Sequence, residues 1–212
     1  MAADAKPTTT RRDRGRAVYR LTGEQALRMI DAGIIPDGVD VELWDGVLYT
    51  MTKHEPHNFS VGVTADALRA VLPAGFHVRE EKSVRHGLDS LPQPDVAVVR
   101  GPWRSYQTRH PTLHDVALVV EVCASTEHAD RVVKPRRFAE VGIPVYWLID
   151  LNRREVEVQT LPQGLGQAAR YTRVDSFSVG QEFPVVLDGR ELGRIAVVDI
   201  LPVEGADGGG VA

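Results

Sequence analysis

The chain has 212 residues, of which 43% are hydrophobic and 25% are charged, and its formal net charge at pH 7 is -4. This length is sufficient for one well-buried core, so a single domain is the default expectation. The single cysteine, Cys123, excludes an intramolecular disulfide and a cysteine zinc cluster. An acidic net charge provides no overall attraction to nucleic acid, so any DNA contact requires local basic patches.

The two ends of the chain differ in composition from its middle. Residues 1–18 are polar and rich in arginine, which predicts a disordered basic tail, and residues 204–212 are too rich in glycine to order themselves. Residues 19–203 remain as one expected domain. The N-terminus lacks the apolar segment of a secretory signal, and no stretch approaches the roughly 20 apolar residues of a membrane-spanning helix. We therefore expect a cytoplasmic protein with no membrane partner.

The first half of the domain mixes helices and strands. In chain order we expect a helix capped by Thr22, a hairpin turning at Asp45-Gly46, a helix over 57–72 and a charged, half-exposed strand over 76–86. The Asp-Gly pair is the strongest turn signal, because both residues tolerate the positive φ angles of a two-residue hairpin turn.

The second half is built around two apolar runs. We expect a buried strand over 93–100, an irregular loop over 101–115, a central strand that begins at Val116, a helix ending at Gly142 and a strand over 145–151. Alternating segments then predict several further strands, the last formed by RIAVVDIL. Strands before and after a single well-defined helix predict an α/β or α+β fold with a mixed sheet.

Two acids stand on the predicted apolar strands. Glu121 is flanked by valines where a strand through the core should carry no charge, and Asp95 stands at the head of the preceding buried strand. A buried carboxylate is costly unless it is paired, hydrogen-bonded or bound to a metal. If the two strands are neighbours, both carboxylates point into one small volume. Lys134 follows Glu121 by 13 positions, near the start of the next helix.

Two oxygen ligands, together with the backbone carbonyl of Val122 and water, suit Mg²⁺ or Mn²⁺. Such a metal lowers the pKa of a bound water and neutralises a phosphate, and a lysine ammonium stabilises the charge that develops on phosphorus. These are the components of a phosphodiester hydrolase. Spacing alone gives this interpretation modest weight, because an Asp and a Glu on apolar strands, here Asp95 and Glu121, also occur as structural ion pairs.

The residues that carry chemistry also form a recognisable order. The strings PDVAVV and VVEVCAST are followed by Lys134, Phe138, Gly142 and YWLID, and VELWDGVLYTM precedes them. This order, over about residues 22–161, resembles the Uma-two family of restriction-endonuclease-like proteins, which belong to the PD-(D/E)XK nuclease superfamily. The resemblance implies a restriction-endonuclease-like core sheet flanked by helices, with extra N- and C-terminal strands.

The resemblance also implies roles for individual residues. It implies Asp95 and Glu121 as metal ligands and Lys134 as the catalytic lysine of an enzyme that cuts DNA. Glu42 and His57 are expected to support the site, each with the alternative that it merely pairs with a neighbour or begins a helix. By analogy with nucleases that cut both strands, a homodimer is expected. Three arginines around Lys134 are further candidates for phosphate contact: Arg131, Arg136 and Arg137.

Three positions depart from the superfamily pattern. The lysine usually lies two residues after the acid on the same strand, and here that position is Cys123. Pro135 directly follows Lys134, and because proline disfavours a helical conformation at the preceding residue, the helix should begin near Val133 or be kinked there. Phe138 replaces a tyrosine that is usual in the family, and we expect it in the core.

The displaced lysine and the acidic net charge keep a second function open. The chain could be a catalytically silent protein of the nuclease fold that binds DNA or another protein, rather than a magnesium-dependent endonuclease. Hydrolysis of another phosphoester is a third, weaker hypothesis.

Overall fold

The structure is a computed structural model that describes residues 12–13, 16–51, 54–123 and 129–203. The tail predicted at 204–212 and most of the tail predicted at 1–18 lie outside these residues. The chain divides into two compact units. Met1–Thr52 and Ser83–Gln93 form the first, and Lys53–Lys82 and Pro94–Ala212 form the second.

The first unit contains a helix and short strand pairs. The buried side chains of Ala26, Leu43 and Leu91 form its small apolar core. Thr22 caps the helix and exchanges hydrogen bonds with Gln25 in a capping box, as its sequence position predicts. The elements of this unit are β1 (Arg12–Asp13), β2 (Arg16–Ala17), α1 (Gly23–Asp31), β3 (Val41–Trp44) and β4 (Val47–Thr50).

The predicted Asp-Gly hairpin is confirmed in the first unit. Asp45 and Gly46 both have positive φ angles, of 48° and 75°, and join β3 to β4. A Cβ at Gly46 would come within 2.6 Å of the Arg20 Cβ, so glycine serves both the turn and this close approach.

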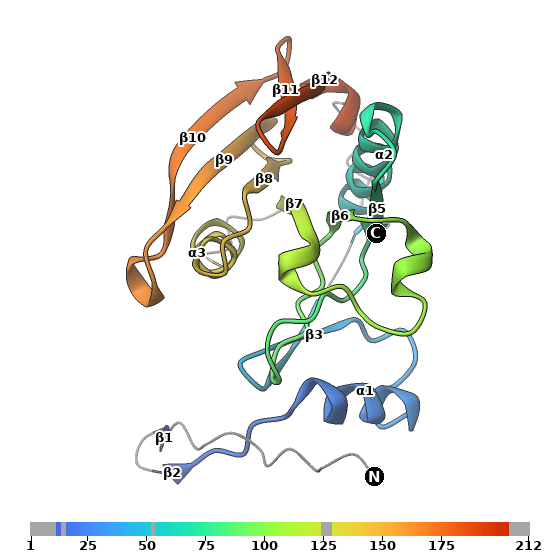
Figure 1. Cartoon of the computed structure of the whole chain (residues 1–212), viewed down its shortest axis with the longest axis vertical. Helices are drawn as coiled ribbons and strands as arrows, with labels where there is room; N and C mark the ends of the chain where they lie inside the picture. Colours follow the sequence, from blue (N-terminus) through green and yellow to red (C-terminus); the bar gives the residue numbers. More distant parts are fainter. Residues whose placement is uncertain (1–11, 14–15, 52–53, 124–128, 204–212) are drawn as a thin grey trace, which may run out of the picture. The chain divides into compact units, whose positions relative to one another are not determined.

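The second unit contains the main sheet, shown in Figure 1. Its helices are α2 (Glu55–Val71) and α3 (Lys134–Glu140). Its strands are β5 (Phe76–Glu80), β6 (Val96–Arg100), β7 (Val116–Cys123), β8 (Val145–Asp150), β9 (Glu155–Gln163), β10 (Arg170–Ser178), β11 (Glu182–Leu187) and β12 (Arg190–Ala196). Short helical turns are η1 (Trp103–Tyr106), η2 (Leu113–Asp115), η3 (Ala129–Val133), η4 (Gly166–Ala168) and η5 (Val197–Ile200).

Six strands pair in the order β10-β9-β8-β7-β6-β5. β7 and β8 run parallel, joined by the crossover that contains α3, and every other neighbouring pair among these strands is antiparallel. β11 and β12 form a separate hairpin. The predicted mixed sheet flanked by helices is confirmed.

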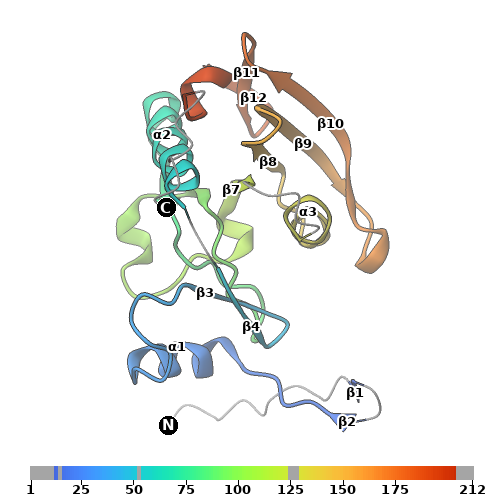
Figure 2. The same ribbon diagram turned by 180° about the vertical axis from the view of Figure 1, so that it is seen from behind.

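Side-chain alternation gives the main sheet two different faces. Val78, Val98 and Trp147 belong to the core with residues of α2, and Trp147 meets Phe183 of β11 edge to face. On the other face, Tyr146 of β8 packs against Phe138 of α3 and Tyr171 of β10. The two helices therefore cover opposite faces, as the views from the front and from behind both show (Figures 1 and 2).

Two predicted strands differ in the structure. The segment 76–86 was expected to be half exposed, but β5 ends at Glu80, and its central residues His77, Val78 and Arg79 are all buried. Pairing with β6 covers this strand, which the charged composition does not reveal. The final segment, RIAVVDIL, continues β12 only to Ala196, after which η5 places Val197 and Ile200 in the core and leaves Val198 exposed.

No helix among the described residues is long and apolar enough to cross a membrane. Phe138 is completely buried, as predicted for a core residue.

Candidate active site

The site is built around Asp95, which directly precedes β6. The register of β6 against β7 pairs Val96 with Val120, which places Asp95 beside the Glu121–Val122 segment of β7. The backbone N–H of Val122 donates a hydrogen bond of 2.7 Å to Asp95 Oδ2. Asp95 is only 6% exposed, so its carboxylate is fixed by the two strands that form the centre of the sheet.

His57 brings the second helix to the same carboxylate. Its Nε2 lies 3.2 Å from Asp95 Oδ2, and its own side chain is buried near the start of α2. Burial alone would lower the pKa of His57, but the hydrogen bond and charge of Asp95 raise it above its ordinary value. Burial would raise the pKa of Asp95, and His57, Lys134 and the Val122 N–H together bring it below its ordinary value.

Lys134 reaches the second acid. Its Nζ lies 2.8 Å from Glu121 Oε2, in a pair whose side chains are 14% and 2% exposed. Glu121 is on the α3 face of the sheet, because its neighbours Val120 and Val122 point into the core against α2. The helix-borne lysine therefore comes to the carboxylate from the face that α3 covers. The position two residues after Glu121 on the strand holds Cys123, which is completely buried.

A π-helical turn, η3, carries the chain into α3 and explains how Pro135 is accommodated. The turn ends at Val133 and the α-helix begins at Lys134, with Pro135 in its first turn, where a proline costs no helical hydrogen bond. The predicted start near Val133, with an irregularity before the proline, is confirmed. π-helical turns are rare and are found often at functional sites.

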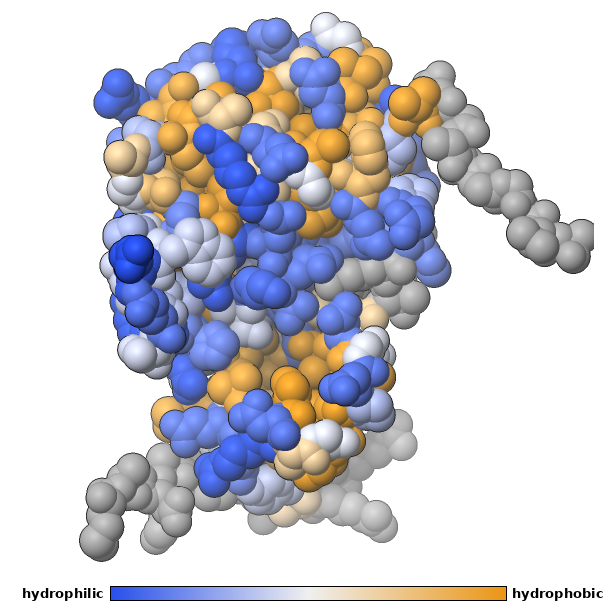
Figure 3. All heavy atoms as spheres, turned by 90° about the vertical axis from the view of Figure 1, so that its right-hand side faces the viewer, coloured by the Kyte–Doolittle hydropathy of each residue, from blue (hydrophilic) through white to orange (hydrophobic). Residues whose placement is uncertain are grey.

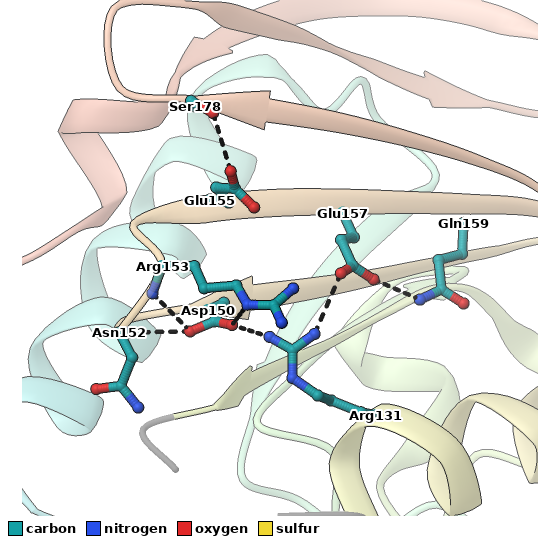
Figure 4. A network of polar contacts seen from close by, with 8 residues as sticks. All are labelled: Arg131, Asp150, Asn152, Arg153, Glu155, Glu157, Gln159 and Ser178. Atoms are coloured by element: carbon teal, nitrogen blue, oxygen red, sulfur yellow. Dashed lines mark hydrogen bonds and ion pairs between the residues drawn. The ribbon is translucent and has the colours of Figure 1, made fainter. Parts of the chain in front are cut away.

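Arg131 anchors this turn to the sheet, as Figure 4 shows. Its guanidinium forms ion pairs with Asp150 at the end of β8 and with Glu157 on β9, where the Nη1–Oε1 distance is 3.2 Å. The same Asp150 accepts hydrogen bonds from the backbone N–H groups of Asn152 and Arg153, so one buried carboxylate fixes both the turn after β8 and the turn before α3. Because both carboxylates engage Arg131, a phosphate would have to compete with them for it.

Three side chains of the second unit could hold a metal ion. His57, Glu81 and Asp95 each offer a ligand atom, and these atoms all lie within 4.8 Å of one another. Glu81 was not singled out from the sequence. Its backbone N–H donates to the carbonyl oxygen of Asp95 (3.0 Å), which follows from the antiparallel pairing of β5 with β6. The signal that could have identified Glu81 is its position one residue after β5, the strand that pairs with β6 next to Asp95.

The other predicted residues have varied positions. Glu42 lies on β3 in the first unit and is buried. Val122 approaches Asp95 through its N–H, whereas its carbonyl was the predicted ligand. Arg136 and Arg137 lie half-buried on α3. The functional roles of all these residues stay predictions, and the structure brings together Asp95, Glu121, Lys134 and His57.

The fold and the site define a protein of the nuclease-fold class. A crystal structure from Anabaena variabilis, described as a putative nuclease belonging to DUF820, superposes with a TM-score of 0.61 at 15% sequence identity. The match covers 85% of this chain and 97% of that chain, and at this identity it shows the fold. A search among curated proteins finds none that matches.

Residues 24–193 match the model of the Uma2 family, which is described as "Putative restriction endonuclease". The match covers most of the chain, and the chain belongs to the Uma2 family. The resemblance noted in the sequence is thereby confirmed.

Proposed function

We propose that this protein is a metal-dependent endonuclease that hydrolyses phosphodiester bonds in DNA. The observation that carries the proposal is the convergence of two buried carboxylates with two cations. Lys134 contacts Glu121 at 2.8 Å, and His57 contacts Asp95 at 3.2 Å; Glu121 lies on β7, and Asp95 directly precedes the neighbouring strand β6. A purely structural pair needs one cation for each acid, but it does not need the third acid, Glu81, within reach of Asp95.

The donor set fits a divalent cation. His57, Glu81 and Asp95 would hold it through two carboxylate oxygens and one imidazole nitrogen, a mixture that suits Mn²⁺ and, with water completing the set, Mg²⁺. When bound, such an ion supplies a water of lowered pKa and neutralises phosphate charge. Glu121 was predicted as a ligand, and in the structure its Oε2 faces Lys134 instead, so a role as ligand requires its second oxygen or a rearrangement of the pair.

The residues of the chain have complementary tasks in this proposal. The Val122 N–H and His57 orient the Asp95 carboxylate. Lys134 Nζ donates hydrogen bonds to a phosphoryl oxygen and stabilises the negative charge that develops there, while Glu121 holds the ammonium in position. Without a metal, Asp95 raises the pKa of His57 and so favours the protonated imidazole; a metal held by His57 would displace that proton.

A plasmid-nicking assay in Mg²⁺ or Mn²⁺, with EDTA as the control, tests the proposal. Wild type should nick supercoiled DNA only with the metal, and Asp95→Ala and Glu121→Ala should each lower the rate about 1000-fold or more while circular dichroism shows an intact fold. Retained nicking in either variant would remove that residue from the mechanism. Isothermal titration of the metal into wild type and Glu121→Gln separates the ligand role of Glu121 from its pairing with Lys134.

The second candidate is a catalytically silent protein of the nuclease fold that binds DNA or another protein. The direct Lys134–Glu121 pair favours it, because a carboxylate that already has a protein cation needs no metal. Metal-independent DNA binding without nicking would support this candidate. The homodimer and the cytoplasmic location stay predictions.

A further inference from the structure

A second group of side chains lies at β5 and the loop after β6. Arg79 pairs in register with Ala97, and Ala97 pairs with Val119, two residues before Glu121, so the side chains of Arg79 and Glu121 point to the same face of the sheet. The loop begins at Gly101, six residues after Asp95, which is about 20 Å along the strand at roughly 3.4 Å per residue. Figure 3 shows one side of the molecule, on which hydrophilic and hydrophobic side chains are interspersed.

Arg79 is a buried cation without an acidic partner. It is 7% exposed, its Nε has no hydrogen-bond partner, and among the described residues no carboxylate pairs with it. Its guanidinium carbon instead lies 4.8 Å from the centre of the Trp103 ring. A buried charge is costly unless it is compensated, and a cation–π contact compensates only part of that cost. Arg79 therefore produces a positive electrostatic potential at Trp103, which attracts an anion that approaches this ring.

Trp103 presents a flat aromatic surface to solvent. It is 52% exposed, whereas Trp44 and Trp147 are 4% and 0% exposed. The ring contacts Arg79 and also His77, whose ring centre is 4.7 Å away. An exposed tryptophan that is held from behind by a cation is a platform on which a nucleobase can stack.

The neighbouring polar groups are suited to a nucleotide. His77 Nδ1 lies 2.6 Å from the Gly101 carbonyl oxygen and donates to it, which holds the imidazole against the Trp103 ring. Arg104, the next residue after Trp103, is exposed, and no described residue pairs with it. Tyr106 fixes the loop to the sheet through its hydroxyl, which donates to the Arg100 carbonyl oxygen at 2.6 Å.

We propose that His77, Arg79, Trp103 and Arg104 form a subsite for one unpaired nucleotide of DNA, with the base on Trp103 and the phosphate at Arg104. The unpaired state follows from the chemistry, because the face of a base inside a duplex is already stacked on its neighbours. The subsite deepens the proposed nuclease function by naming single-stranded or locally opened DNA as the substrate, and it rests on that function only for its biological meaning.

The test measures binding in EDTA, where cleavage does not contribute. A fluorescein-labelled single-stranded oligonucleotide and the blunt duplex of the same sequence are titrated by anisotropy at several salt concentrations. Wild type should bind the single strand more tightly. Trp103→Ala should weaken that binding on the order of 10-fold, and Trp103→Phe should retain most of it. Arg104→Ala should reduce the slope of log affinity against log salt by about 0.7.

Matched controls separate these effects from general changes. Leu165→Ala removes another exposed apolar side chain and Arg173→Ala removes another exposed charge, and both should bind like wild type. Quenching of tryptophan fluorescence by the unlabelled strand should disappear in Trp103→Phe, because the other two tryptophans are buried.

The outcomes also separate this inference from the nuclease proposal. Unchanged binding in both Trp103→Ala and Arg104→Ala, or no single-strand binding by wild type at low salt, would overturn the subsite, whatever the nicking assay shows. Single-strand binding that depends on Trp103, without metal-dependent nicking, would support the subsite and remove the nuclease proposal.

Discussion

Lys134 and Arg79 are two buried cations on one face of the same sheet, and their surroundings differ. Lys134 ends on a carboxylate, 2.8 Å from Glu121, whereas Arg79 ends on an aromatic ring, 4.8 Å from the centre of Trp103. In the first pair each charge compensates the other, so both side chains stabilise the fold only together. In the second, the positive charge is left largely uncompensated, which costs stability and preserves attraction for an anion. The difference agrees with the two proposals, in which Lys134 acts in catalysis and Arg79 in binding.

The largest effect on stability and activity is expected when Lys134 of the first pair is replaced. Lys134→Met should destabilise the protein by about 3–5 kcal/mol, because it leaves Glu121 buried without its cation, and should lower nicking by roughly 100- to 1000-fold. Urea unfolding and the plasmid assay measure the two effects. The double variant Lys134→Met/Glu121→Gln should regain most of the stability and none of the activity. Recovery of both would mean that the pair has no catalytic part.

The placement of Lys134 can be disturbed without touching it. Arg131→Ala removes the cation that joins η3 to Asp150 and Glu157, which should cost about 1–3 kcal/mol, since two carboxylates lose a charged hydrogen-bond partner. We expect nicking to fall on the order of 10- to 100-fold through misplacement of the lysine. Arg131→Lys should restore part of the activity. If Arg131 only positions Lys134, the activity should fall by the same factor at every DNA concentration, and the DNA affinity in EDTA should be unchanged. A loss of DNA affinity would instead indicate that Arg131 contacts phosphate.

Replacing Arg79 should change the stability in the opposite direction from replacing Lys134. Arg79→Met removes an uncompensated buried charge and keeps an apolar side chain of similar length, so we expect about 1 kcal/mol of added stability together with weaker single-strand binding. Thermal unfolding and anisotropy on the same samples measure both. A strongly destabilised Arg79→Met would show that the arginine has a structural partner, and the comparison with Lys134 would then fail.

The smallest effect concerns the loop that carries Trp103. The pKa of Asp115 is lowered to about 2: burial alone would raise it, but the hydrogen bonds from Arg109 and from Thr112 lower it. A carboxyl group whose folded pKa is depressed stabilises the fold above its unfolded pKa of 3.8, and this stability is lost as the pH falls toward 2. Because both side chains are partly exposed, the loss should stay below about 1 kcal/mol. Asp115→Asn should remove this pH dependence, which urea unfolding between pH 5 and pH 2 measures.

The sequence predicts the framework of the site well, because local signals determine it. Glu121 interrupts an apolar strand and Asp95 begins another, and the observed pairing of β6 with β7 brings the two acids together. The contact of Lys134 with Glu121 depends on a crossover helix whose start is altered by Pro135. The periodicity of the sequence does not specify which residue a side chain at such a helix start contacts.

Glu81 and Arg79 could not be identified in the same way. They lie in a stretch so rich in charge that it resembles an exposed strand, and only the pairing of β5 with β6 buries it. The aromatic contact of Arg79 joins residues 24 positions apart across an irregular loop, where sequence patterns carry little information on distance.

The parallel pairing of β7 with β8 links the acid to the order in which the chain can assemble. β5, β6 and β7 can pair through consecutive antiparallel connections, but Lys134 reaches Glu121 only after the crossover has docked α3. A sheet centre closed before that step would hold Glu121 buried without the Lys134 ammonium, which costs free energy. Closing the sheet is therefore more favourable once α3 has brought the ammonium group into place.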